Sequence, residues 1–240
     1  MVDTDSSGGL AVPRDLVIIG AGGFAPEGIC VAEDINAANL EKGRKPAWNI
    51  RGFVVFDPAK FPQTIYSYPV LGTPKQAAAR FAGTDIFFIC MIGDNRIREE
   101  QAREAEELGW KAVALVHPTV TVRRETTIGP GSYVGAGSII SPFVKVGAHV
   151  VISVNVLVAH NSVMEDFSQA CPGACINGRC VVGRSALIGS NATLLPRCSV
   201  GQSAVVGANS VAMRSVPPHT TVMGVPASVV VRRDTNQSRS

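Results

Sequence analysis

Two residues, His160 and Gly178, are of types that together could carry out acyl transfer. A neutral imidazole can take the proton of an attacking amine or hydroxyl and so act as a general base. A backbone N–H that no side chain covers can stabilise the oxyanion formed when a thioester carbonyl is attacked. His160 and Gly178 are 18 residues apart. This chemistry therefore requires a fold that brings residues 18 apart to the same place on neighbouring turns.

We do not expect the other three histidines to take part in this chemistry. His117 precedes a proline, and we expect it to shape a junction between two parts of the chain. His149 and His219 have no expected task. The spacing of the four histidines does not offer the three convergent ligands of a catalytic zinc site, so we expect no metal and no chemistry of the carbonic anhydrase kind.

A six-residue period supplies the required fold. Every sixth residue from 122 to 206 is aliphatic, and the position four residues after each is small or Val throughout. A helix of period 3.6 or a strand of period 2 loses phase with such a repeat, whereas a β-helix coil of three six-residue sides keeps it. The aliphatic series is Val122, Ile128, Val134, Ile140, Val146, Ile152, Val158, Met164, Ala170, Ile176, Val182, Ile188, Leu194, Val200 and Val206.

The repeat also predicts the interior and the corners of the coil. Each side is expected to contribute one large side chain to the interior and one small residue near a corner. Glycine follows the aliphatic residue at 129, 135, 147, 183, 189, 201 and 207. We expect these glycines to supply backbone freedom at the turns.

The first hundred residues are typical of a short α/β unit with a parallel sheet. Such a sheet binds ligands at the carboxyl ends of its strands. We expect about four strands, near 16–19, 52–56, 85–91 and 112–116, with helices at 26–40, after Pro74 and at 97–108.

The glycine-rich turn after the first strand is a candidate phosphate site, because backbone N–H groups at a helix start bind anions. Gly20, Gly22 and Ala25 also match the dinucleotide fingerprint. The acidic residue expected about 20 positions later is instead Asp57, some 35 residues past Gly22. We therefore favour a nucleotide-containing substrate over NAD, with a structural turn as the alternative.

Charge divides the chain into two parts. Residues up to Ala112 carry twelve Lys and Arg against fifteen Asp and Glu (−3), and the remainder carries ten against four (+6), which sum to the net +3. A basic C-terminal part suits a polyphosphorylated ligand. No basic cluster is interleaved with aromatic residues, so nucleic acid is not expected as a partner.

The apolar runs and the cysteines bear on membrane insertion, cellular location and metal binding. We find no run of eighteen apolar residues and a polar N-terminus, so we expect no membrane span, no signal peptide and a cytoplasmic location. The six cysteines fit no zinc spacing. Cys180 and Cys198 occupy the small position of the repeat and are expected to be core thiols, whereas a reactive role for Cys171 and Cys175 stays open.

A series of motifs resembles that of the bacterial sugar acetyltransferases typified by the bacillosamine-precursor, perosamine and sialic acid enzymes. In order, these are GAGGFA after a strand, GF with a later Asp, IGDNRIR, HPTV, the hexapeptide array with AHN, PGA, NG and VG, and GVPA. The resemblance runs from about 15 to 231. It implies a nucleotide-sugar-binding Rossmann-like domain (14–112), a left-handed parallel β-helix acyltransferase domain (113–231) and flexible tails (1–13 and 232–240). It also implies a homotrimer with acetyl-CoA between neighbouring β-helices.

The resemblance carries site residues over to this sequence. It makes His160 the catalytic base and Gly178 the residue that binds the thioester carbonyl, with Asn161 beside the base. The implied acetyl-CoA contacts are Gln169, Gly173, Ala174, Gly178, Ser190 and Ala208. The implied substrate contacts are Gly22, Gly23, Phe24, Asp57 and Gly93.

The chain differs from the family's motifs at four places near the site. Asn161 stands where an acid commonly follows the catalytic His, so either Glu165 or Asp166 substitutes or the base is weaker. Phe24 replaces the usual His of the glycine-rich turn, a carboxylate pair after GF is reduced to Asp57, and Gln169 replaces a His that contacts CoA.

These features predict an acetyl-CoA-dependent N-acetyltransferase that acts on a nucleotide-linked amino sugar. The nearest alternative is an O-acetyltransferase that acts on a sialic-acid-like sugar. The other alternative is a trimeric binding module that keeps the solenoid but has lost efficient chemistry.

Overall fold

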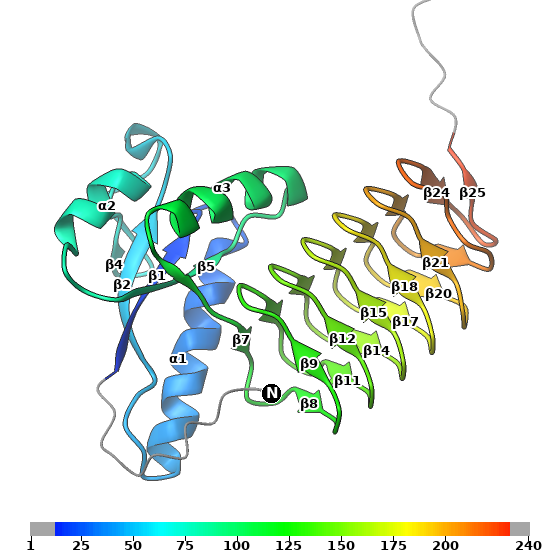
Figure 1. The fold of residues 1–240 in the computed structure, drawn as a ribbon, viewed down its shortest axis with the longest axis horizontal. Helices are drawn as coiled ribbons and strands as arrows, with labels where there is room; N and C mark the ends of the chain where they lie inside the picture. The colour runs from blue at the N-terminus through cyan, green and yellow to red at the C-terminus, as the bar shows by residue number, and fades with distance from the viewer. Residues whose placement is uncertain (1–12, 231–240) are drawn as a thin grey trace, which may run out of the picture.

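The computed structural model describes residues 13–230, and it consists of an α/β unit followed by a left-handed parallel β-helix (Figure 1). The tails expected at 1–13 and 232–240 lie outside the described residues, apart from Pro13. The α/β fold and the β-helix are as predicted. The division at residues 112 and 113 stays a prediction.

Buried apolar runs form the middle of the parallel sheet. Residues 16–19 are fully buried and lie in the inner strand β1, between β2 and β5. The strand order is β2-β1-β5-β6, which confirms the expected four strands. Their bounds are β1 Arg14–Ile19, β2 Trp48–Val54, β5 Ile86–Cys90 and β6 Lys111–Ala112. A short hairpin of β3 (Thr64–Ile65) and β4 (Tyr68–Pro69) and a 3-10 turn (Pro58–Lys60) follow β2 in the chain.

Local sequence signals mark the start of each helix, and side chains cap α2 and α3. α1 (Ala25–Glu41) begins directly after the glycine-rich turn, with a proline in its first turn. α2 (Pro74–Arg80) begins with a capping box, in which the side chains of Thr73 and Gln76 each accept a hydrogen bond from the other's backbone N–H. The carboxylate of Asp94 accepts from two backbone N–H groups at the start of α3 (Asn95–Glu107).

The β-helix has three faces, each a stack of short parallel strands that pair with the strand 18 residues away. The exceptions end face 1, where β24 pairs with β22 at a spacing of 16 residues and β25 pairs antiparallel with β24. Face 1 consists of β7 (Leu115–Val116), β10 (Tyr133–Val134), β13 (Val151–Ile152), β16 (Gln169–Ala170), β19 (Leu187–Ile188), β22 (Val205–Val206), β24 (Thr221–Met223) and β25 (Ser228–Val229). Face 2 consists of β8 (Thr121–Val122), β11 (Ile139–Ile140), β14 (Leu157–Val158), β17 (Cys175–Ile176), β20 (Thr193–Leu194) and β23 (Val211–Ala212). Face 3 consists of β9 (Thr127–Ile128), β12 (Lys145–Val146), β15 (Val163–Met164), β18 (Val181–Val182) and β21 (Ser199–Val200).

The interior follows the predicted repeat from 134 onward, where every member of the aliphatic series is at most 4% exposed. Val122 is 38% exposed and Ile128 is half-buried, because they lie in the first coil, which has a neighbouring coil on one side only. Cys180 and Cys198 are buried core thiols, as expected. One strand was assigned to the wrong unit: residues 115–116 pair with β10 and so begin the β-helix, whereas the α/β sheet ends at β6.

The glycines that follow the aliphatic residues have a different role from the one expected. None of them has a positive φ, and the left-handed residue of each corner is the third after the aliphatic one, as at Phe143, Asn155 and Asn161. A Cβ on Gly189 would lie 2.5 Å from the backbone N of Ala208 in the next coil. These glycines therefore allow two coils to approach closely, whereas the left-handed positions turn the chain and are occupied mainly by Asn, Gly and Ser.

The α/β unit packs on face 1 and on the corner between faces 3 and 1 (Figure 1). Leu115, Tyr133 and Val151 point outward from face 1 and join the apolar cluster of α1. His117, at the start of the β-helix, lies 3.0 Å through Nε2 from the carboxylate of Asp34 on α1, as expected for a junction residue. None of the helices in the described range is both long and apolar enough to cross a bilayer.

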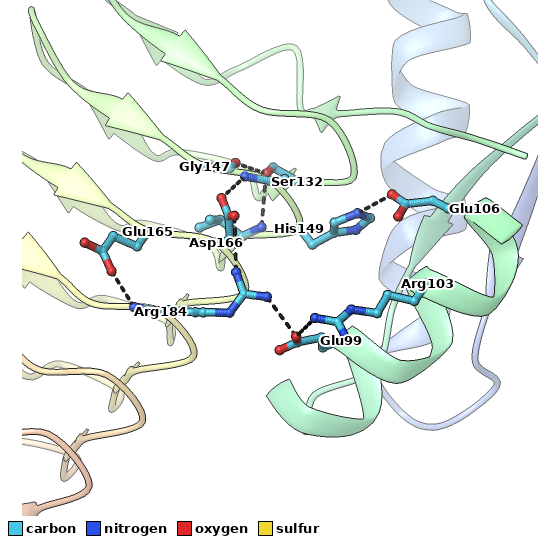
Figure 2. Close-up of polar contacts among 11 residues, drawn as sticks. Glu99, Arg103, Glu106, Ser132, Gly147, His149, Glu165, Asp166 and Arg184 are labelled. Carbon is cyan, nitrogen blue, oxygen red and sulfur yellow. Dashed lines mark hydrogen bonds and ion pairs between the residues drawn. The ribbon is translucent and has the colours of Figure 1, made fainter.

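His149, for which the sequence suggested no role, is also a junction residue. Its ring is 3% exposed and stacks against Phe167 at 4.9 Å, and Phe88 of β5 lies on its other side. Its Nε2 lies 3.0 Å from a carboxylate oxygen of Glu106 on α3 (Figure 2). Burial lowers the pKa of His149, and the Glu106 carboxylate opposes that effect in part.

Gly189→Ala is expected to lower the free energy of unfolding by about 1 to 3 kcal/mol, because the added methyl group meets the backbone of the next coil. Ser203→Gly, at a left-handed corner (φ 53°), is the matched control and should change it by less than about 1 kcal/mol. Urea denaturation measures both. An unchanged stability of Gly189→Ala would contradict the close-approach role.

His149→Phe is expected to remove part of the acid sensitivity of the fold. Because its pKa is lowered in the folded state, the unfolded chain binds the proton first, so stability falls as the pH drops below about 6.5. Phenylalanine already occupies left-handed corners at 143 and 167. Urea unfolding from pH 7.5 to 5.5 should show a smaller pH slope for His149→Phe than for the wild type and for the control His219→Phe, at an exposed corner. Equal slopes would contradict this assignment.

Candidate active site

The structure brings His160 and Gly178 together as the spacing predicts. β14 and β17 pair in parallel on face 2, and each is followed two residues later by one member of the pair. Both residues therefore lie at the corner between faces 2 and 3. A Cβ built on Gly178 would lie only 2.6 Å from Nε2 of His160. Any side chain at 178 would displace the imidazole, so glycine is required for this contact.

The backbone at this corner leaves a hydrogen-bond donor next to the imidazole. The hydrogen bonds that join the coils here use the N–H groups of Ala159 and Arg179, which donate to Ile176 and His160 carbonyls at 2.8 and 2.9 Å. No partner for the Gly178 N–H is found within residues 13–230. The exposed imidazole of His160 and the unused N–H of the buried Gly178 thus lie side by side, which is the arrangement that acyl transfer requires.

Asn161 orients the imidazole. Its Oδ1 lies 3.0 Å from Nδ1 of His160. An amide oxygen can only accept, so this contact favours the tautomer in which Nδ1 carries the proton and Nε2, beside Gly178, has the free lone pair. The residue sits at the left-handed position of the corner, with φ of 60°. Asn is among the few residues that adopt this conformation readily, so one side chain meets both the backbone and the orienting requirement.

Neither acidic residue considered as a substitute reaches His160. Glu165 and Asp166 lie at the corner between faces 3 and 1 (Figure 2). Glu165 accepts from the backbone N–H of Arg184, and Asp166 accepts from the N–H of Ala148 and pairs with the Arg184 guanidinium at 3.2 Å. Because both carboxylates are held at another corner, the possibility that either one replaces the missing acid is excluded for the single chain.

The residues expected to contact acetyl-CoA fall at two corners. Gly173, Ser190 and Ala208 lie at the corner between faces 1 and 2, and Gln169 lies beside them on β16. Gly178 lies at the next corner, across face 2. Ala174 is fully buried, so only its backbone is open to a ligand. The structure therefore divides the expected set between the two edges of face 2.

The two cysteines near this region are poorly suited to a reactive role. Cys171 and Cys175 are half-buried, and burial raises the pKa of both thiols. The Gln169 amide donates to Sγ of Cys171 at 3.7 Å. A thiol rather than a thiolate is favoured at both positions, and the thiolate is the nucleophilic form.

All five residues expected to contact substrate line one cavity of about 470 Å³ at the carboxyl ends of β1, β2 and β5. Gly22, Gly23 and Phe24 form the turn before α1, Asp57 follows β2, and Gly93 follows β5. The sequence did not identify Phe56, Phe61, Met91 and Ile92, which also line it. Phe61 lies in a loop without a motif, so no sequence signal pointed to it.

The cavity walls are largely apolar. Phe24, Phe56 and Phe61 supply three aromatic rings, and Phe24 also packs edge-on against Tyr133 of face 1 at 5.4 Å. Asp57 is the single charged residue among those lining the cavity, and its carboxylate pairs with Lys60 at 3.1 Å. Aromatic walls next to a turn of backbone N–H groups suit a ligand that combines a ring with an anionic group.

The single chain does not place this cavity beside His160. The α/β unit packs on face 1, and the corner between faces 2 and 3, which carries His160, is the corner opposite face 1. Within residues 13–230, no three His, Cys, Asp or Glu side chains come together in a group that could hold a metal ion.

Comparisons with known proteins relate both parts of the chain to acetyltransferases. Residues 15–105 match the family described as the PglD N-terminal domain. A GDP-perosamine N-acetyltransferase of Escherichia coli O157:H7 is 30% identical over 114 residues, which cover 45% of this chain and 49% of that protein. The match thus spans about half the length of this curated relative.

Two solved structures extend the likeness over nearly the whole chain. PerB from Caulobacter crescentus, solved with CoA and GDP-perosamine, is 28% identical, has a TM-score of 0.79, and covers 93% of this chain and 100% of its own. The acetyltransferase domain of PglB from Neisseria gonorrhoeae FA1090, solved with acetyl coenzyme A, is 28% identical, has a TM-score of 0.78, and covers 91% and 100%. The chain is therefore similar to these acetyltransferases over nearly its whole length, and its residues 15–105 match the PglD N-terminal domain family.

Proposed function

We propose that this protein is an acetyl-CoA-dependent N-acetyltransferase that acts on a nucleotide-linked amino sugar. The observation that carries the proposal is the position of Nε2 of His160, only 2.6 Å from where a Cβ on Gly178 would lie, in a chain whose relatives are acetyltransferases. The cavity lined by aromatic residues and the glycine-rich turn supports a nucleotide as part of the substrate. A cytoplasmic location stays a prediction.

In this reaction His160 acts as the general base. Its Nε2 takes a proton from the sugar amine as the amine nitrogen attacks the thioester carbon, and the Gly178 N–H donates to the carbonyl oxygen on which negative charge develops. Collapse of the intermediate breaks the carbon–sulfur bond, and His160 returns the proton to the CoA sulfur. The products are the amide and free CoA. Asn161 holds the neutral imidazole in the tautomer that leaves the lone pair of Nε2 free before the proton is taken up.

The orienting role of Asn161 favours an enzyme over a binding module that has lost its chemistry. A degenerate site has no need for a hydrogen bond that fixes the tautomer of an exposed histidine. N-acetylation is favoured over O-acetylation because the Escherichia coli O157:H7 relative is described as a GDP-perosamine N-acetyltransferase. No observation on the structure separately favours a hydroxyl acceptor.

The proposed donor site lies along face 2 and its two corners. The small residues Gly173, Ser190 and Ala208 at one corner leave room for a ligand close to the backbone. At the other corner, Arg179 and Arg197 are exposed on successive coils, and neither forms an ion pair within the described residues. Guanidinium groups suit the phosphates of CoA.

We further propose that the active site is completed by a neighbouring chain in a homotrimer. The cavity and His160 of one chain lie on opposite sides of its β-helix. A second β-helix placed against face 2 would supply the missing side of the donor site. In a closed ring each chain then gives its cavity to one neighbour and its histidine to the other.

The direct test of the function is thiol release from acetyl-CoA. The protein is incubated with acetyl-CoA and a panel of amino sugars linked to UDP, dTDP and GDP, and free thiol is measured with a chromogenic reagent. Turnover with at least one amino sugar, and an N-acetylated product by mass spectrometry, is the expected result. No thiol release with any acceptor would argue for the binding module.

His160→Ala should lower kcat by about 10²- to 10⁴-fold, which is the usual contribution of a general base. The affinity for acetyl-CoA, measured by calorimetry, should stay within a few-fold, since the imidazole is proposed to act on the acceptor. His219→Ala removes another exposed corner histidine and is the control. Retention of more than a tenth of wild-type kcat in His160→Ala would remove this residue from the role.

Asn161→Asp should move the acid limb of the kcat/KM profile to higher pH, because an adjacent carboxylate stabilises the imidazolium form and a neutral amide does not. Aspartate also tolerates the left-handed backbone, so the fold should persist. Asn155→Asp makes the same change at another left-handed corner and should leave the profile in place. An unchanged profile in Asn161→Asp, or one displaced to lower pH, would show that residue 161 does not couple to the base.

Mixing two inactive variants tests the shared site. His160→Ala and Gly22→Trp, which fills the cavity, are each expected to be inactive. When subunits of the two variants are exchanged, about one interface in four combines an intact cavity from one chain with an intact histidine from the next. The mixture should therefore regain about a quarter of wild-type activity. Light scattering should give three times the monomer mass. A monomer, or mixtures that stay inactive in trimers, would contradict the arrangement.

A further inference from the structure

Arg98 is a fully buried cation that no carboxylate neutralises within the described residues. Its guanidinium donates instead to four neutral oxygens: the carbonyls of Ile92, His149 and Phe167 at 2.8, 3.2 and 2.8 Å, and the side-chain oxygen of Asn95 at 2.8 Å. Burial lowers the pKa of Arg98 to about 10, which leaves it charged at neutral pH. A buried charge is costly unless it is fully hydrogen-bonded, so this arrangement is a specific one.

Two of these oxygens belong to successive coils of the β-helix. His149 and Phe167 are left-handed corner residues 18 positions apart, and their carbonyls take no part in the backbone ladder that joins the coils. The next carbonyl in this column, that of Ser185, accepts from the side-chain amide of Asn95 at 2.9 Å. The first turn of α3 therefore contacts three consecutive coils through carbonyls that the β-helix itself leaves unused.

The third carbonyl belongs to the wall of the substrate cavity. Ile92 lines the cavity together with Met91 and Gly93, and its carbonyl accepts from Nη1 of Arg98. One guanidinium thus binds both the cavity wall and the β-helix. A planar group with five donors in fixed directions can hold several carbonyls at once, and lysine cannot reproduce that geometry.

A second, more exposed contact lies further along the same corner. The Arg184 guanidinium pairs with Glu99 of α3 at 2.8 Å and with Asp166 at 3.2 Å (Figure 2). It also lies over the ring of Phe167, 4.9 Å from the ring centre. Exposed ion pairs of this kind contribute little to stability by themselves. The buried contacts of Arg98 tie the cavity wall, as well as α3, to the β-helix.

We propose that Arg98, supported by Asn95, is a positioning residue that fixes the cavity wall at 91–93 relative to the β-helix, so that a bound nucleotide sugar is presented at a defined position to the acyl-transfer corner. This inference rests on the proposed function. Arg98 touches neither His160 nor the cavity interior, so it acts through the wall it holds. Misplacement of a reacting group by about 1 Å can cost about 10²-fold in rate, which makes such an anchor consequential.

The sequence contains these residues in the IGDNRIR motif, which by itself indicates only a turn and a helix start. Asp94 caps the helix, whereas Asn95 and Arg98, one helical turn apart, face the β-helix. Arg96 of the same motif is exposed. The two arginines of one helix turn therefore provide a matched pair for experiment.

The test compares Arg98→Lys, Asn95→Ala and the control Arg96→Lys in the full-length protein. Amide hydrogen exchange of residues 91–95 should speed up by about tenfold or more in Arg98→Lys, since the carbonyl of Ile92 loses its donor. In steady-state kinetics kcat/KM for the nucleotide sugar should fall about tenfold or more, with a lower kcat, while the KM for acetyl-CoA stays within about twofold. Asn95→Ala, which keeps the buried charge, should show smaller changes in the same direction, and Arg96→Lys should show none.

Two results would overturn the proposal. Unchanged exchange at 91–95 in a folded Arg98→Lys variant would show that the wall is not held by Arg98. A lower melting temperature with unchanged kinetic constants for both substrates would show that the residue only stabilises the fold. If the wild type turned over no amino sugar, the proposed function would fail, whereas the exchange measurement would still decide whether Arg98 anchors the wall.

Discussion

The rest of the structure depends on the stacking of one coil of the β-helix on the next. Parallel strands on each face pair residues 18 apart, and the strand spacing of about 4.8 Å sets the distance between successive corners. At one corner this spacing places His160 against Gly178. At another it presents the carbonyls of His149, Phe167 and Ser185 in a column to α3. Both corners have the ordinary backbone of the repeat and differ from the other corners only in their side chains.

The backbone conformation of the corner restricts which side chains can do this. Every corner from 125 to 209 has a left-handed residue, and Asn161 is the one that follows the histidine. Asn and Asp both tolerate this conformation, so the backbone does not choose between them. The difference is chemical, since the amide orients the ring without adding a charge that would stabilise its protonated form. Asn161 therefore orients the His160 ring without supplying a negative charge beside it.

The two parts of the chain meet through polar contacts around a buried core. Glu99 of α3 forms an ion pair with Arg184 of the β-helix, and the carboxylate of Glu106 lies 3.0 Å from Nε2 of the buried His149 (Figure 2). Arg98 is different, because it is a cation within the acidic unit and it binds only neutral oxygens. Its binding partners are backbone groups, which occupy fixed positions in the repeat, and this explains how one side chain can define the position of a neighbouring cavity.

The sequence by itself determined the β-helix, the parallel sheet and the His160–Gly178 pair, because each depends on a periodic or local pattern in the order of the residues. The sequence also placed a ligand site at the glycine-rich turn, because carboxyl ends of parallel strands meet at one edge of a sheet, and the cavity lies there. The role of the corner glycines, the separation of Glu165 and Asp166 from the base, and the contacts of Arg98 and His149 were decided only by the tertiary structure. These depend on which corner a residue occupies and on how α3 docks there, and such long-range packing between distant segments leaves no pattern in the order of the residues.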